Sequence, residues 1–225
     1  MNLLQDSVGE FSVKATTSAD LFVGCLENVI HYILMKRQVY PRDKFQDIQK
    51  SGMNMVLLSD TFPSEYITKM LRAARDYLDR GELDRVVLCI IGIASGEVME
   101  RWQFSVDRSE VPKESTENPE VVNQVYNETA QFIKQIGVSF MPPLDCYCSF
   151  KILLYVAKAA SQPDENWENS HPHYVDEKME ASLDLRPVNV PHHKLQAVVV
   201  YKNTDMSFVS FASSQSQSYA SASSN

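Results

Sequence analysis

Residues 85–106 constrain the fold more than any other stretch of the chain, because two strand patterns there are joined by one short break. Residues 86–93 are nearly all apolar and rich in β-branched side chains, which is typical of a strand covered on both faces. Apolar and polar side chains then alternate over residues 98–106, which predicts a second strand, although Glu100 falls on the apolar side. Glycine adopts the backbone angles that a short turn needs, so Gly96 completes a predicted antiparallel hairpin.

Three further segments carry apolar residues at helical spacing, and four more carry strand patterns. The first helix, with Ser18 as its cap, has a wide apolar face and is expected to be the central buried helix. Its His31 is interpreted as a packed helix residue and not as a ligand. We expect the other helices over residues 64–80 and 119–136, with Gly137 ending the last of them. The further strands are expected over residues 54–58, 146–157, 182–190 and 194–201.

The composition is that of one globular domain. The 225 residues are enough for one substantial core, and no stretch inside the chain resembles a linker. Neither the N-terminal sequence nor any apolar run is typical of a signal peptide or a membrane span, which predicts an intracellular protein with reduced cysteines. The net charge of -8 argues against a general affinity for nucleic acid, because phosphate binding needs clustered Lys and Arg.

Three segments lack the periodicity of helices and strands. Residues 1–12 are expected to be a flexible N-terminal arm, and the Ser-rich residues 207–225 a disordered tail. Between them, residues 161–180 contain Trp167 among acidic and amide side chains, with two prolines. An irregular crossing of this length inside a compact domain is usually functional or mobile. It is the first feature of the sequence that points beyond a structural scaffold.

Cysteine and histidine residues near the C-terminal end raise the possibility of a metal-dependent or thiol enzyme. The candidates are Cys146, Cys148, His171, His173, His192 and His193. The C-x-C spacing differs from the C-x2-C spacing of zinc sites, and thiols within a core strand lack the exposed, electropositive surroundings of a nucleophile. The sequence also contains no glycine-rich phosphate-binding motif and no G-x-S-x-G motif. By elimination, the sequence favours a binding module without metal or cofactor over an enzyme.

Five strings of residues, taken together and in order, resemble the HORMA domain family. They are ILMKRQVYPRDKF (residues 33–45), SGEVMERWQF (95–104), CSF (148–150), ENWENS (165–170) and LDLRPVNVPHHKLQAVVVYK (183–202). The resemblance covers residues 13–203 with similar spacing, so the set is specific although no single string is. The hairpin and the last string are most similar to the spindle checkpoint branch of the family.

The resemblance implies an α+β fold, in which three helices pack on a mixed β-sheet within a HORMA domain of residues 13–206. It also implies that residues 160–206 form a mobile C-terminal "safety belt". Members of the family trap an extended peptide of a partner as an added strand beside the strand that matches residues 146–157, and then close the belt over it. Main-chain hydrogen bonds give affinity in such a mode, and side-chain pockets select the partner. The chain is therefore expected to exchange between an open, empty conformer and a closed, peptide-bound one.

The resemblance also implies roles for individual residues. The peptide-binding strand and its pocket are matched by Phe150, Ile152, Leu154 and Tyr155, the belt anchor by Trp167, and the packing residues of the belt by Leu185, Val198, Val200 and Tyr201. Each of these residues is also compatible with a purely structural place in the core. A surface that joins two conformers is matched by Lys134 and Gln135, where lysine keeps the charge of the family's arginine but not its planar guanidinium.

The implied function is that of a non-enzymatic adaptor of the spindle assembly checkpoint, which delays anaphase. The implied partners are the activator of the anaphase-promoting complex and a checkpoint receptor protein, each bound through a peptide. A homodimer of open and closed conformers and an AAA-type ATPase remodeller with its adaptor are also implied. The expected location is the nucleus and cytoplasm, and kinetochores in mitosis, without direct binding to nucleic acid or membrane. The alternative within the family is an accessory subunit of translesion DNA polymerase zeta, which uses the same belt on other peptides.

Overall fold

The computed structural model describes residues 17–50, 53–139, 141–160 and 167–203. The predicted N-terminal arm (residues 1–12) and the predicted Ser-rich tail (207–225) lie outside these residues. The long helices are α1 (Ser18–Lys36), α2 (Thr61–Asp79) and α3 (Pro119–Val138). The strands are β1 (Phe45–Lys50), β2 (Met53–Leu58), β3 (Leu83–Gly92), β4 (Val98–Arg108), β5 (Cys148–Val156), β6 (Glu180–Val190) and β7 (His193–Lys202).

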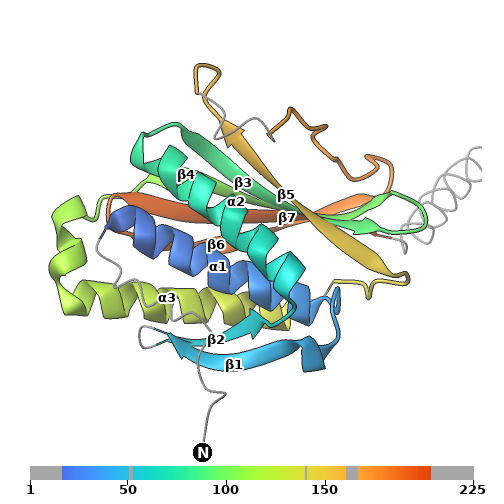
Figure 1. Cartoon of the computed structure of the whole chain (residues 1–225), viewed down its shortest axis with the longest axis horizontal. Helices are drawn as coiled ribbons and strands as arrows, with labels where there is room; N and C mark the ends of the chain where they lie inside the picture. The colour runs from blue at the N-terminus through green and yellow to red at the C-terminus, as the bar shows by residue number, and fades with distance from the viewer. Residues whose placement is uncertain (1–16, 51–52, 140, 161–166, 204–225) are drawn as a thin grey trace, which may run out of the picture.

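The larger of the two sheets has the strand order β5-β3-β4-β7-β6, and each neighbouring pair is antiparallel. The three helices cover one face of this sheet, and the β1–β2 hairpin lies beside α1 and α3 (Figure 1). The predicted α+β fold, with three helices packed on a sheet, is therefore confirmed. Because β5 and β6 are its edges, each has one row of main-chain groups that the sheet itself does not pair.

The predicted hairpin forms the centre of the sheet as β3 and β4. Gly96 in its turn has a φ of +69°, the left-handed conformation that glycine adopts without steric cost. Strand β3 is covered on both faces, as its apolar run predicted. Val86 and Leu88 belong to the main core under the helices, whereas Val87 and Cys89 form a second cluster on the opposite face.

Glu100, which interrupts the apolar pattern of β4, is buried under the helices with an exposed fraction of 1%. It forms an ion pair with Arg37, the residue that caps the C-terminal end of α1. The indole N–H of Trp102 donates to its second carboxylate oxygen at 2.9 Å. Burial raises the pKa of Glu100, and the nearby Arg37 charge opposes that rise. The irregularity in the sequence therefore marks a buried ion pair and not an error in strand register.

Helix α1 is the buried central helix that its pattern predicted, but its N-cap is Thr17 and not Ser18. The Thr17 hydroxyl accepts from the Asp20 N–H, and the Asp20 carboxylate accepts from the Thr17 N–H, which is a capping box. Contrary to the sequence-based expectation, α1 is long and apolar enough to pass the length and hydropathy test for a membrane span. Of the 18-residue apolar stretch of this helix, 67% is buried inside the protein, as in the core helix of a globular fold.

Other boundaries differ from their predictions. Helix α2 begins at Thr61 instead of residue 64, and strand β1 was not predicted. Helix α3 continues past Gly137 to Val138, so the glycine does not end it. A methyl group at Gly137 would lie 2.7 Å from the hydroxyl oxygen of Tyr32 on α1, so glycine leaves room for the end of the Tyr32 side chain.

Candidate peptide-binding site

Strand β5 presents main-chain groups along the outer edge of the sheet. Its inner side pairs with β3, where Ile152 lies opposite Leu88. The N–H and C=O groups of Ile152 itself point away from β3 and bond to the hydroxyl of Tyr66 on α2. The Ile152 N–H donates to this hydroxyl oxygen at 2.9 Å, and the hydroxyl donates to the Ile152 carbonyl at 3.3 Å. Because alternate residues of an antiparallel strand direct their main-chain groups to the same side, Phe150 and Leu154 also present theirs outward.

The side chains of β5 alternate between the two faces of the sheet. Those that pack with the main core under the helices are Phe150, Ile152 and Leu154. The ring of Phe150 lies 5.7 Å from the ring of Tyr66 and 6.1 Å from that of Tyr40, measured between centroids. Tyr155 lies on the opposite face with the second cluster. Ile152 is buried and the other three predicted residues are half-buried, so they border the edge without closing it.

Residues 167–179, which we call the crossing segment, pass around the edge of β5 from one face of the sheet to the other. On the helix side Trp167 packs against the main core, and Nζ of Lys69 on α2 lies 5.7 Å from the centre of its ring. Three residues later, Ser170 Oγ accepts from Nζ of Lys151 at 3.1 Å on the opposite face. The segment has neither helix nor strand and runs beside the sheet (Figure 1), which confirms the predicted irregular crossing for these residues.

On the face away from the helices, the crossing segment contacts Arg101 of β4, which is only 6% exposed. The Arg101 Nε donates to the Pro172 carbonyl at 3.3 Å, and its Nη2 donates to the Tyr155 hydroxyl at 3.2 Å. Its guanidinium carbon also lies 5.1 Å from the centre of the Tyr174 ring. Arg101 thus links the predicted peptide-binding strand to the crossing segment, a role that no pattern in the sequence indicated.

The four hairpin residues predicted to pack the belt lie on strands β6 and β7. Val198 and Val200 are half-buried and lie opposite Gln103 and Arg101, on the face that carries the crossing segment. Leu185 is buried in the main core on the helix side, and Tyr201 packs against that core from a half-buried position. The structure therefore gathers Trp167 and the β5 residues at one edge, and places these four residues on strands beyond β4.

Helix α3 covers the other edge of the sheet, along β6. The Gln135 side-chain oxygen accepts from the Arg186 N–H at 3.0 Å, and the Glu128 carboxylate accepts from the Asn189 N–H at 2.7 Å. Lys134, the other half of the predicted conformer-joining pair, is exposed. The two members of that pair are thus in different settings, because Gln135 already binds main chain within its own subunit.

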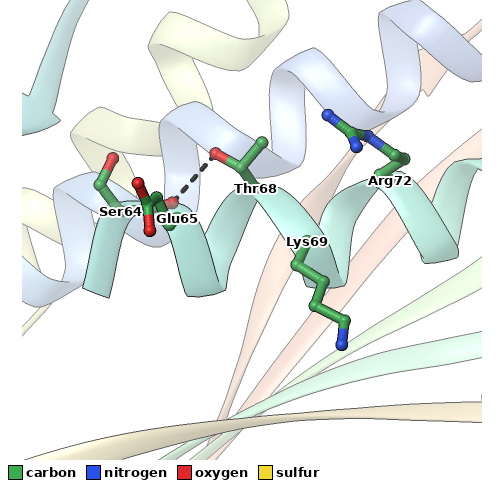
Figure 2. A pocket seen from close by; sticks show the side chains of 5 residues that line it. All are labelled: Ser64, Glu65, Thr68, Lys69 and Arg72. Atoms are coloured by element: carbon green, nitrogen blue, oxygen red, sulfur yellow. Dashed lines mark hydrogen bonds between the residues drawn. The ribbon is translucent and has the colours of Figure 1, made fainter. Parts of the chain in front are cut away.

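A shallow hollow on the outer surface of α2 is lined by Ser64, Glu65, Thr68, Lys69 and Arg72 (Figure 2). The Thr68 hydroxyl donates to the Ser64 carbonyl at 2.9 Å, a bond within the helix. The side chain of Lys69 extends toward the sheet, away from that of Arg72 (Figure 2). From this surface, Lys69 reaches the ring of Trp167 in the crossing segment.

The cysteines and histidines that raised the enzyme alternative do not converge. The Cys146 and Cys148 sulfur atoms are 3.7 Å apart at the start of β5. Burial, with the neighbouring Cys146 thiol, raises the pKa of Cys148 to about 12, so this thiol stays protonated near neutral pH. His193 lies at the β6–β7 turn beside Ser18. Among the described residues, no group of three or more His, Cys, Asp or Glu side chains is placed to hold a metal ion.

Comparison with known proteins places this architecture in a family. The model of the HORMA domain family matches residues 18–193. The human protein "Mitotic spindle assembly checkpoint protein MAD2A" is 31% identical over 196 residues, which are 86% of this chain and 94% of the human chain. A chain in the crystal structure of the mitotic checkpoint complex is similar with a TM-score of 0.73 and 29% identity, over 82% of this chain and 98% of that chain.

A more distant solved structure, C. elegans HTP-2 bound to the HIM-3 closure motif, has a TM-score of 0.65 and 15% identity, over 83% of this chain and 91% of that chain. At this identity the similarity concerns the fold alone. The checkpoint matches favour the checkpoint branch over the translesion polymerase subunit that the sequence left open. The chain belongs to the HORMA domain family and, within it, to the MAD2 proteins of the mitotic spindle checkpoint.

Proposed function

We propose that this protein is a spindle assembly checkpoint adaptor that traps an extended peptide of its partner at the outer edge of β5, under the safety belt of residues 160–206. One observation carries the proposal: main-chain groups of β5 face outward at Ile152, and the crossing segment passes around the same edge. The similarity to MAD2 checkpoint proteins and to a chain of the mitotic checkpoint complex supports a role for this site in the spindle checkpoint.

The peptide binds as an added strand. Neighbouring strands lie about 4.8 Å apart, so it forms main-chain hydrogen bonds with the outward groups of Phe150, Ile152 and Leu154. Its side chains alternate between the two faces of the sheet. One set meets the aromatic rings of Tyr40, Tyr66 and Phe150, and the other set meets the face of Lys151 and Tyr155. Main-chain bonding therefore gives affinity for extended peptides in general, and these two surfaces select among them.

The closed conformer is the one with the β6–β7 hairpin on β4 and the crossing segment around β5. In this arrangement β7 pairs with β4 from Glu100 to Arg108. We propose that the open conformer lacks this pairing and that exchange is slow because the pairing must break first. Two packings of one segment coexist only when their free energies differ by a few kcal/mol. Shifting the ratio of closed to open conformers from 1:99 to 99:1 requires a ligand that binds the closed conformer more tightly by about 5.5 kcal/mol. A trapped peptide supplies this difference.

The proposed partners are a checkpoint receptor protein and the activator of the anaphase-promoting complex, with remodelling by an AAA-type ATPase and its adaptor. A dimer of open and closed conformers forms through the surface around Lys134 and Gln135. The protein acts by binding and not by catalysis, in the nucleus and cytoplasm and at kinetochores in mitosis. The exposed position of Lys134 supports the dimer surface, because an exposed cation is available to a second chain.

The test compares two substitutions at one position of β5. Leu154→Pro deletes an outward N–H, whereas Leu154→Ala shortens the same side chain and keeps that N–H. Binding of peptides from the checkpoint receptor and from the activator is measured by isothermal titration calorimetry, with a polymerase zeta peptide as comparison. We expect Leu154→Pro to bind at least tenfold more weakly than Leu154→Ala while both stay folded by circular dichroism. Equal affinities, or binding of the polymerase peptide alone, contradict the proposal.

A further inference from the structure

Tyr66 occupies the edge at which a peptide is proposed to bind. Its hydroxyl accepts from the Ile152 N–H at 2.9 Å and donates to the Ile152 carbonyl at 3.3 Å. An added antiparallel strand offers the same two partners, one carbonyl and one N–H, to a residue with outward main-chain groups. The Tyr66 hydroxyl therefore imitates one residue of an added strand.

The position of this hydroxyl is set by the fold. Tyr66 projects from α2, a helix of 19 residues, and its ring lies 5.7 Å from the ring of Phe150, the residue two places before Ile152. Burial raises the pKa of Tyr66, so the phenol keeps its proton at neutral pH and acts as donor and acceptor at once. A single phenol thereby satisfies both outward main-chain groups of Ile152.

We infer that Tyr66 is a placeholder for the trapped peptide: it caps the outer edge of β5 at Ile152 and is displaced when a peptide adds to that edge. This inference rests on the proposed function. Unpaired edges are sites of non-specific pairing between chains, and a side chain that covers one lowers that risk. The cost is a lower affinity for the true partner, which must first replace the two hydrogen bonds of the hydroxyl.

The placeholder also restricts the peptide. The peptide residue opposite Ile152 must donate an N–H and accept with a C=O to replace the hydroxyl fully, and proline has no N–H. A proline at that position leaves the Ile152 carbonyl without its donor, which the displaced Tyr66 no longer supplies. We therefore expect trapped peptides to carry a residue other than proline opposite Ile152, with an aromatic or aliphatic neighbour that packs beside Phe150.

The experiment uses Tyr66→Phe, which removes the hydroxyl and keeps the ring. The matched control is Tyr40→Phe, because Tyr40 lies 6.1 Å from Phe150 on the same aromatic surface. The first measurement is amide hydrogen exchange at Ile152 in the peptide-free full-length chain. We expect exchange at least threefold faster in Tyr66→Phe and unchanged in Tyr40→Phe. Equal rates in the wild type and Tyr66→Phe overturn the placeholder.

The second measurement is the dissociation constant of a twelve-residue peptide selected on the wild-type protein from a random display library. We expect Tyr66→Phe to bind it about fivefold to a hundredfold more tightly, because the peptide no longer has to displace the two neutral hydrogen bonds of the hydroxyl, and to self-associate more in analytical ultracentrifugation. Equal or weaker binding overturns the displacement step, because the hydroxyl would then be neutral or part of the peptide site. If no peptide binds either protein, the proposed function fails, while the exchange rate at Ile152 still decides whether Tyr66 caps the edge.

Discussion

The Nε atom of Arg101 on β4 donates to the main-chain carbonyl of Pro172, 3.3 Å away, across the face of the sheet opposite the helices. The same guanidinium reaches the Tyr155 hydroxyl and lies over the Tyr174 ring. A residue from the centre of the sheet thus holds both the crossing segment and the strand at which the peptide is proposed to bind. The segment is attached here by side-chain contacts and not by strand pairing.

This contact predicts that Arg101→Gln loosens the crossing segment more than the rest of the fold. We expect local opening of residues 167–179 to become easier by about 1–2 kcal/mol, because one charge-assisted hydrogen bond and the ring contacts are lost. Hydrogen exchange measured by mass spectrometry checks this. The control is Arg85→Gln, because the guanidinium carbon of Arg85 also lies over the ring of Tyr155, 5.0 Å from its centre. Equal loosening in the two variants would show that Arg101 has no special hold on the segment.

The buried ion pair between Glu100 and Arg37 predicts a large effect of a small change. Glu100→Gln leaves the Arg37 cation, whose side chain is 10% exposed, without its counter-charge. We expect a loss of about 3 kcal/mol in the free energy of unfolding, measured by urea denaturation. Glu97→Gln breaks an exposed pair with Lys202 and is expected to cost less than about 1 kcal/mol.

A double variant separates charge burial from packing in this pair. Arg37→Met combined with Glu100→Gln removes both charges, so we expect it to be more stable than Glu100→Gln alone. If the double variant is as unstable as the sum of the two single ones, the carboxylate acts through its bond with Trp102 and not through Arg37.

His193 predicts a pH dependence of stability. Burial, helped by the charges of His192 and Lys113, lowers the pKa of His193 from 6.5 to about 4. The unfolded chain therefore takes up a proton below about pH 6.5, whereas the folded protein does so only near pH 4. The free energy of unfolding is expected to fall as the pH drops from 6.5 to 4, with no further loss from this group below that range.

Substitution of this histidine tests its share of the pH dependence. His193→Gln is expected to flatten the fall in the urea midpoint between pH 7 and pH 5. His171→Asn is the control, because His171 is exposed and lies in the crossing segment instead of beside His193. A pH profile that is the same in wild type and His193→Gln would assign the fall to other groups.

The edge of β6 predicts different roles for two adjacent residues of α3. Gln135→Ala removes the acceptor of the Arg186 N–H and is expected to destabilise the protein by about 1 kcal/mol. Lys134→Ala, at an exposed position, is expected to change stability by less than about 0.5 kcal/mol. Thermal unfolding measures both. A conformer dimer weakened by Lys134→Ala at unchanged stability would support the proposed dimer surface.

The sequence by itself determined the elements whose evidence is local. Periodicity among neighbouring residues predicted the β3–β4 hairpin and the buried face of α1. The lack of such periodicity predicted the irregular residues 167–179. The resemblance of separate strings identified the family for the same reason. Element ends were less predictable, because a cap such as Thr17 depends on backbone geometry, and Gly137 serves a contact with another helix.

Only the tertiary structure decided which groups meet at the β5 edge. Tyr66 and Ile152 are 86 positions apart in the chain, and Arg101 and Pro172 are 71 apart. Sequence periodicity reports on neighbouring residues, so it does not indicate which distant residue the side chain of Tyr66 or Arg101 contacts. Strand order makes β5 an edge and places these side chains beside it. The edge position of β5, the contact of Tyr66 with it and the contact of Arg101 with the crossing segment therefore arise from packing and not from local pattern.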